Sequence, residues 1–227
     1  MRIKTATKIT PKGYLLELII YIAIMFLIRE TSIPNTHYLV TGFLYSGTTL
    51  LVATLFMKRR GITWKSIGLR RPKSIPNTFL IAGIVVIIII SLLLIFNLIQ
   101  DSFSFVKESS EAAKGTSTGQ TLSNGDYGYV FYVILFVWLQ SGLEELLERG
   151  FLITWVEGLF SNWKFKTVIA VIFQACIWGF RHSYDISDRS VSVALIGIIM
   201  GIVYVKFDRN LWPVIIAHCA MNTISLL

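Results

Sequence analysis

The stretch FLIAGIVVIIIISLLLIFNLI, residues 79–99, contains no ionisable side chain. A helix of about 20 apolar residues crosses the ~30 Å hydrocarbon core of a bilayer. The whole chain of 227 residues shares this character, because 54% of its residues are hydrophobic and only 15% are charged. The sequence therefore predicts an all-α, polytopic transmembrane helical bundle.

Apolar runs of suitable length predict about seven spans. They lie at about 14–28, 38–57, 79–99, 128–147, 166–181, 190–205 and 211–227. The first span follows a basic leader but has no small-residue cleavage site, so we expect it to stay in the protein. A polar segment at 101–127, rich in Ser, Thr and Gly, predicts a flexible external loop. It separates an N-terminal three-span block, residues 1–100, from a C-terminal four-span block, residues 128–227.

Lysine and arginine positions predict the orientation. The tail before the first span holds four cations, and the loop after the second span holds seven, both without an acid. The 100–127 segment holds two lysines and four acids. The positive-inside rule therefore places the N-terminus and the turns at 161–166 and 206–210 in the cytoplasm. Topology also accounts for the net charge of +8, so we expect no nucleic-acid partner in this integral protein, which we assign to a bacterial plasma membrane.

The N-terminal block offers little chemistry. Glu17 alone interrupts the first span, three residues from its end, and we expect it to reach the membrane interface. Cys176 and Cys219 fall within predicted spans, where thiols pack as small apolar groups and a disulfide is not expected. A cysteine nucleophile at Cys219 beside His218 is an alternative, but no neighbouring residue is arranged to form a thiolate.

The C-terminal block carries polar residues that are costly in lipid and therefore indicate function. The stretch SGLEELLERGFL, residues 141–152, holds three glutamates and one arginine. Later spans carry His182 in WGFRH, and His218 with Asn222 in AHCAMN. One such residue alone is as often a packing residue as a functional one, but the set of them favours a buried site.

Helical geometry separates two adjacent glutamates. Residues four apart share one face of a helix, so Glu145 can pair with Arg149. Glu144 is rotated by ~100° and lacks this cation. The sequence therefore predicts a structural role for Glu145 and leaves Glu144 available for chemistry.

The fourth and fifth spans predict an antiparallel hairpin closing at about Trp163. Glu144 and His182 each lie nineteen residues from that point, so they stand at the same height. A buried carboxylate and an imidazole at one level can share and activate a water molecule. His218 and Asn222 can donate hydrogen bonds to the oxyanion formed when that water attacks an amide.

Three motifs now carry a resemblance. Glu-Glu-x-x-x-Arg at 144–149, aromatic-x-x-x-His at 178–182 and His-x-x-x-Asn at 218–222 resemble the CAAX-protease and bacteriocin-processing (CPBP, or Abi) family of intramembrane endopeptidases. The likeness covers about residues 128–227. It implies that water is activated by a glutamate and a histidine, with a second histidine and an asparagine in the oxyanion hole. Carried onto this chain, the catalytic residues are Glu144, His182, His218 and Asn222, and the supporting residues are Glu145, Arg149 and Trp178.

The family has also been described as metalloproteases. On that alternative Glu144, His182 and His218 would hold Zn²⁺ with one position open for water. The sequence has no His-Glu-x-x-His helix, and an oxyanion role leaves His218 little freedom to bind a metal. The sequence therefore favours a glutamate protease without a cofactor.

Three residues depart from the family pattern. Trp178 replaces the usual Phe, Glu148 stands where an aromatic residue is common, and Arg181 precedes the motif histidine where an uncharged residue is usual. In the hairpin Arg181 lies level with Glu145, ~4.5 Å along the axis from Glu148. This predicts a Glu148–Arg181 ion pair beside the site. The alternative is that Arg181 reaches the outer headgroups or pairs with Asp185.

The resemblance implies an endopeptidase acting on a peptide or membrane-protein substrate within the bilayer. That substrate is a prenylated tail, a bacteriocin leader or a signalling peptide. The alternative is a non-catalytic relative that binds a partner membrane protein or confers bacteriocin immunity. An ion-coupled carrier is less favoured, because the two halves show no inverted repeat.

Overall fold

The computed structural model describes residues 11–30, 38–102 and 127–226. The basic tail before residue 11 and most of the predicted external loop, 103–126, lie outside these residues. Every regular element in the described ranges is helical, which confirms the predicted fold class. The elements are α1 (Pro11–Glu30), α2 (Tyr38–Arg59), α3 (Ile75–Ile99), η1 (Gln100–Ser102), α5 (Tyr127–Glu145), η3 (Leu146–Leu152), α6 (Ile153–Leu159), α7 (Lys166–Ser183), α8 (Asp188–Lys206) and α9 (Trp212–Leu226).

Five helical segments of the described residues are long and apolar enough to cross a membrane. They are Pro11–Ile28, Val40–Arg59, Ile75–Ile99, Val130–Leu159 and Asp188–Lys206. The other two expected spans are helical, as α7 with 18 residues and α9 with 15, but they do not meet this description. The described helix α9 is shorter than the ~20 residues of a full span.

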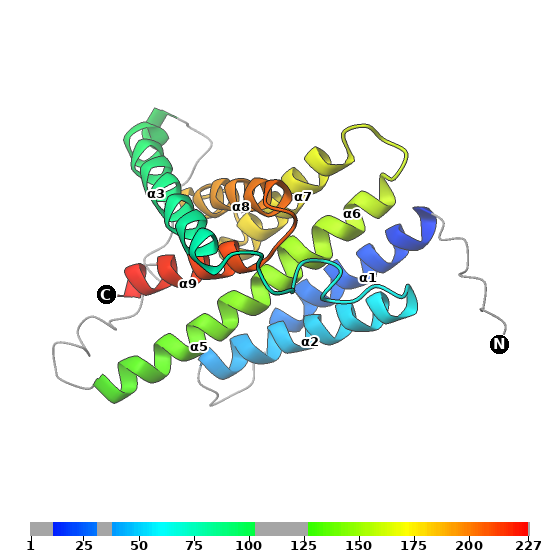
Figure 1. Ribbon diagram of the computed structural model, residues 1–227, viewed down its shortest axis with the longest axis horizontal. Helices are drawn as coiled ribbons and strands as arrows, with labels where there is room; N and C mark the ends of the chain where they lie inside the picture. The colour runs from blue at the N-terminus through cyan, green and yellow to red at the C-terminus, as the bar shows by residue number, and fades with distance from the viewer. Residues whose placement is uncertain (1–10, 31–37, 103–126, 227) are drawn as a thin grey trace.

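A single long rod made of α5, η3 and α6 crosses the molecule diagonally (Figure 1). Helices α1 and α2 run along one side of this rod, and α7, α8 and α9 lie on the other. The sequence prediction ended the fourth span at residue 147, which is wrong. The chain stays helical because η3, a π-helix with i→i+5 hydrogen bonds, carries the ladder past the charged residues.

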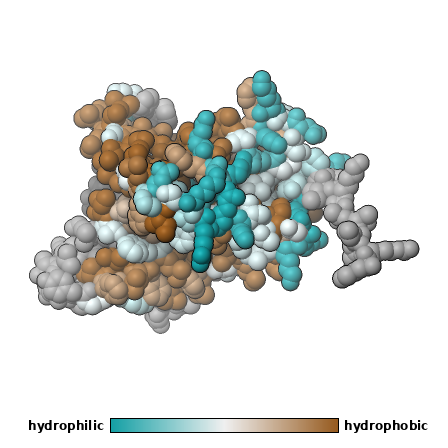
Figure 2. Space-filling view, in the orientation of Figure 1, coloured by the Kyte–Doolittle hydropathy of each residue, from teal (hydrophilic) through white to brown (hydrophobic). Residues whose placement is uncertain are grey.

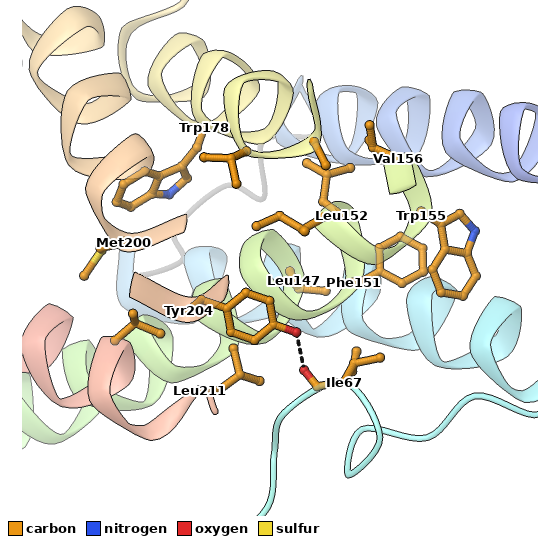
Figure 3. Packing of buried hydrophobic residues seen from close by; sticks show 14 of the residues in the cluster. Ile67, Leu147, Phe151, Leu152, Trp155, Val156, Trp178, Met200, Tyr204 and Leu211 are labelled. Atoms are coloured by element: carbon orange, nitrogen blue, oxygen red, sulfur yellow. Dashed lines mark hydrogen bonds between the residues drawn. The ribbon is translucent and has the colours of Figure 1, made fainter. Parts of the chain in front are cut away.

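The core joins segments that are far apart in the sequence (Figure 3). The ring of Phe151 stacks on Trp155 with centroids 4.1 Å apart, and Tyr21 of α1 packs on Phe151 at 4.7 Å. The hydroxyl of Tyr204 on α8 donates to the carbonyl oxygen of Ile67 at 2.7 Å. The core therefore holds α1, the central rod, α8 and the α2–α3 connection together.

Glu17, which was expected to extend to the membrane interface, is paired within the protein. Its Oε2 atom accepts hydrogen bonds from Arg60 Nε at 2.6 Å and from Trp155 Nε1 at 2.9 Å. Its side chain is only 12% exposed. Arg60, which directly follows α2, contacts Glu17 on α1, and Trp155 of α6 contacts the same carboxylate. Glu17 thus links the N-terminal helices to the C-terminal block.

Helices α7 and α8 pack closely and so fix the position of the α7 motif residues. A Cβ atom on Gly179 would lie 2.4 Å from the carbonyl oxygen of Ser190 and 2.7 Å from Ala194 Cβ. Small residues let helices in a membrane approach in this way. The turn between α6 and α7 lies at 160–165, where the sequence placed the end of the hairpin near Trp163.

Candidate active site

The centre of the site is a buried ion pair on the rod. Arg149 Nη1 donates to Glu145 Oε1 at 3.0 Å, and both side chains are fully buried. This confirms the pair predicted from their spacing. The same Oε1 atom lies 2.8 Å from Nδ1 of His218 on α9, a contact that was not predicted. Because a carboxylate only accepts, His218 Nδ1 carries the hydrogen.

Glu144 has a different environment from its neighbour. The amide of Gln140 donates to its Oε1 atom at 3.1 Å, and the indole N–H of Trp178 donates to Oε2 at 3.2 Å. Its side chain is partly exposed, whereas Glu145 is not. Glu144 therefore receives hydrogen bonds from two uncharged donors and, as a residue, is less fully enclosed than Glu145.

Trp178 of α7 is the residue around which the site assembles. Its ring meets the rings of His182 and His218 edge to face, with centroids 5.2 and 5.5 Å away. The guanidinium carbon of Arg149 lies 4.1 Å from its centroid, within cation–π range. Both histidines lie within electrostatic range of Glu144. Residues from α5, η3, α7 and α9 therefore converge on one indole.

The orientations of His182 and Asn222 are set by hydrogen bonds. His182 Nδ1 lies 2.8 Å from the carbonyl oxygen of Trp178, so Nδ1 carries the hydrogen and Nε2 of the neutral ring is left as an acceptor. Asn222 Nδ2 donates to the hydroxyl of Ser141 at 3.0 Å. The side chains expected to act on water and on an oxyanion are thus held in defined rotamers.

The predicted Glu148–Arg181 ion pair is present. Arg181 Nη1 donates to Glu148 Oε1 at 2.7 Å, with 18% of the Arg181 side chain and none of Glu148 exposed. The buried hydroxyl of Tyr21 lies within electrostatic range of both. Helix α1 therefore borders the site, although the sequence analysis found little chemistry in the N-terminal block.

The alternative zinc site is not formed by the described residues. Within ranges 11–30, 38–102 and 127–226, no group of three or more His, Cys, Asp or Glu side chains is arranged to hold a metal ion. The structure thus brings Glu144, His182 and His218 near one another, but not in an arrangement that could bind one metal ion. Both cysteines are free thiols. Cys176 is exposed rather than buried as expected, and Cys219 donates to the carbonyl oxygen of Trp138 at 3.7 Å.

Sequence reasoning missed three polar partners. Gln140 and Ser141 hold Glu144 and Asn222, and Tyr21 lies beside the second ion pair. The sequence does indicate the Gln140 contact, because Gln140 precedes Glu144 by four residues on the same helical face. A tyrosine in an apolar span has no such signal.

The fold and the buried polar cluster define an integral membrane protein with an acid–histidine site inside its helical bundle. Residues 126–224 match the family described as type II CAAX prenyl endopeptidase Rce1-like. This part of the chain is therefore similar to that family, in agreement with the resemblance carried by the three motifs. At the level of the family, this match supports a CAAX-type intramembrane protease. No curated protein and no solved structure matches the chain.

The Glu148–Arg181 pair should be strongly coupled in stability. Glu148→Leu and Arg181→Leu each break this buried ion pair, and we expect each to cost about 3 kcal/mol or more. The double variant should lose clearly less than the sum. Thermal unfolding of the four proteins in detergent measures this. Additive losses would contradict the coupling.

A more exposed pair serves as the control. Arg209 Nη2 and Glu157 Oε1 lie 2.7 Å apart, with 37% and 13% of the side chains exposed. The equivalent leucine cycle at this pair should show weaker coupling, because solvent screens the charges.

Proposed function

We propose that this protein is an intramembrane endopeptidase that hydrolyses a peptide bond of a membrane-associated peptide or protein. The observation that carries the proposal is the convergence of Glu144, His182 and His218 on Trp178. A carboxylate and two oriented imidazoles in one buried cluster are the groups that water-dependent amide hydrolysis requires.

Glu144 and His182 activate the water. The carboxylate of Glu144 accepts one proton from a water molecule held between the two residues. His182 Nε2 accepts the second O–H as a hydrogen bond, because Nδ1 is occupied by the Trp178 carbonyl. The water oxygen, now aligned, attacks the carbonyl carbon of the substrate amide.

His218 and Asn222 stabilise the oxyanion. In this mechanism His218 donates from Nε2 with both ring nitrogens carrying hydrogen, while Nδ1 donates to the Glu145 carboxylate. The amide of Asn222 has two hydrogens, of which Ser141 takes one and the oxyanion takes the other. Two preorganised donors in a water-poor site favour the tetrahedral intermediate.

Collapse of the intermediate completes the reaction. The C–N bond breaks, and the proton that Glu144 took from water passes to the leaving amine. One water is consumed, and the products are a carboxylic acid and an amine. The name of the matched family, a CAAX prenyl endopeptidase, makes a prenylated C-terminal tail the first substrate to test, with a bacteriocin leader or a signalling peptide next.

Glu144→Gln and His182→Ala should each abolish cleavage while the protein stays inserted and folded. Each change removes a group that contacts the attacking water, so a loss of at least about 100-fold is expected. The assay uses the purified protein in liposomes with a panel of fluorogenic peptides, including a farnesylated CAAX tail and a double-glycine leader. Near-normal turnover by either variant would reject the mechanism.

Glu157→Gln is the matched control for these variants. It changes a carboxylate on the same rod that pairs with Arg209 rather than with the site, so cleavage should persist. If every protein is inactive on the panel, and bacteriocin immunity or partner binding survives Glu144→Gln, the non-catalytic alternative replaces the protease.

Trp178→Phe tests the departure from the family's usual residue. The substitution keeps a ring near both histidines but removes the only N–H that reaches Glu144 Oε2 from α7. We expect a fall in kcat of roughly 10-fold or more with little change in KM, as for other groups that orient a reacting side chain. Unchanged kcat would mean that the indole N–H has no part in positioning Glu144.

Metal removal tests the remaining alternative. Activity carried by Glu144 and His182 should survive exhaustive chelation, and elemental analysis should find no stoichiometric zinc in the purified protein. One zinc per chain, with activity restored only by adding the metal back, would instead support a metalloprotease.

A further inference from the structure

A pocket of about 220 Å³ lies between the α2–α3 and α8–α9 connections, away from the candidate active site. Its charged lining residues are Arg70, Arg71, Lys73, Lys206 and Asp208. Figure 2 shows hydrophilic residues gathered across the middle of this face, where Figure 1 places these connections. Three positive charges therefore remain after Asp208 is balanced.

The pocket has a fixed frame. The amide of Leu211 donates to the carbonyl oxygen of Gly68 at 3.1 Å, which ties the two connections together. Gly68 has a φ of +118°, and a Cβ there would lie 2.2 Å from the carbonyl oxygen of Arg209. The guanidinium of Arg70 also donates to the backbone oxygen of Asp208. The cations are thus gathered by contacts between segments over 130 residues apart.

Two of the cations are available to a ligand. Lys73 pairs with the Asp208 carboxylate, and its hydrogen bond holds the pKa of Asp208 below the ordinary value. Arg71 and Lys206 are exposed and have no hydrogen-bond or ion-pair partner among the described residues. Both line the pocket, whose one carboxylate, Asp208, is paired with Lys73.

The N-terminus of α3 does not supply these donors. The Ser74 side chain already accepts from the amide of Asn77, and Pro76 has no N–H. The positive character of the pocket therefore comes from side chains, and it can be removed by substituting them.

The wall of the pocket leads directly onto an exposed apolar surface of α3. Thr78 and Ile81 of α3 line the pocket, and α3 is the most apolar of the candidate spans. Phe79 and Leu80, in the same turn, are 59% and 61% exposed. A ligand that fits this junction has an anionic head at the cations and an apolar tail along α3.

We propose that this pocket binds the phosphate-bearing headgroup of an anionic phospholipid, with the acyl chains lying against α3. Guanidinium and ammonium groups match phosphate oxygens. Basic pockets between membrane helices are suited to anionic headgroups on the cytoplasmic side, which is the side that the positive-inside rule predicts for both connections.

The test is lipid binding to the purified, detergent-solubilised protein, followed by native mass spectrometry. Short-chain phosphatidylglycerol is compared with phosphatidylcholine of the same chain length and with soluble glycerol phosphate. We expect phosphatidylglycerol to bind best, and Arg71→Gln with Lys206→Gln to weaken its binding at least tenfold. Equal binding of the two lipids overturns the proposal. Equal affinity for glycerol phosphate identifies a free phosphate compound, not a lipid, as the ligand.

A charge-matched variant separates the pocket from general surface charge. Lys65→Gln with Lys164→Gln removes two cations that lie outside the pocket, and phosphatidylglycerol binding should persist. Equal loss in both double variants would show a diffuse effect and reject the site. Asp208→Asn provides a gain-of-binding test, because it frees Lys73 and removes the only carboxylate from the described lining; weaker binding by this variant would also reject the site.

Discussion

The contact on which the bundle most depends is the Glu145–Arg149 pair, placed where lipid and protein exclude water. An unpaired charge buried inside a membrane protein is costly, and three neighbouring helices supply contacts to the pair. Helix α9 supplies His218, α7 supplies the face of Trp178, and α8 supplies the sulfur of Met200, 3.4 Å from the guanidinium. A buried pair is weak evidence for stability in itself. The pair instead restricts how α7, α8 and α9 can be positioned along the rod, because each must keep its contact with the buried charges.

The N-terminal helices take part in the same arrangement. Glu17 receives hydrogen bonds from Arg60 and from Trp155, while Tyr21 packs on Phe151 at the level of the charged residues. The matched family segment begins only at residue 126. The C-terminal block thus packs against α1 close to its motif residues, through Tyr21 on Phe151 of η3.

Sequence reasoning was most successful where rise per residue alone decides a contact. The Glu148–Arg181 pair followed from counting along two helices from one turn, and the fold class followed from apolar length. It failed where a contact depends on how separate elements dock. The Glu145–His218 contact needs the position of α9, and the Glu17–Arg60 pair joins residues 43 positions apart through a returning connection. The π-helical turn leaves no clear mark in residue pattern, because it changes hydrogen bonding within a continuous helix.

The negative and positive side chains along the rod are not equal in number. Three carboxylates and two guanidinium groups lie on η3 and the facing turns of α5 and α7, which leaves one negative charge in excess. In a medium of low dielectric constant, that charge needs a proton or a cation nearby. In the proposed mechanism Glu144 must stay ionised to act as the base, so the compensating positive charge has to come from another group in the cluster. Because the carboxylate of Glu145 contacts His218 directly, the oxyanion donor of the proposed mechanism belongs to the same buried charge cluster as its base.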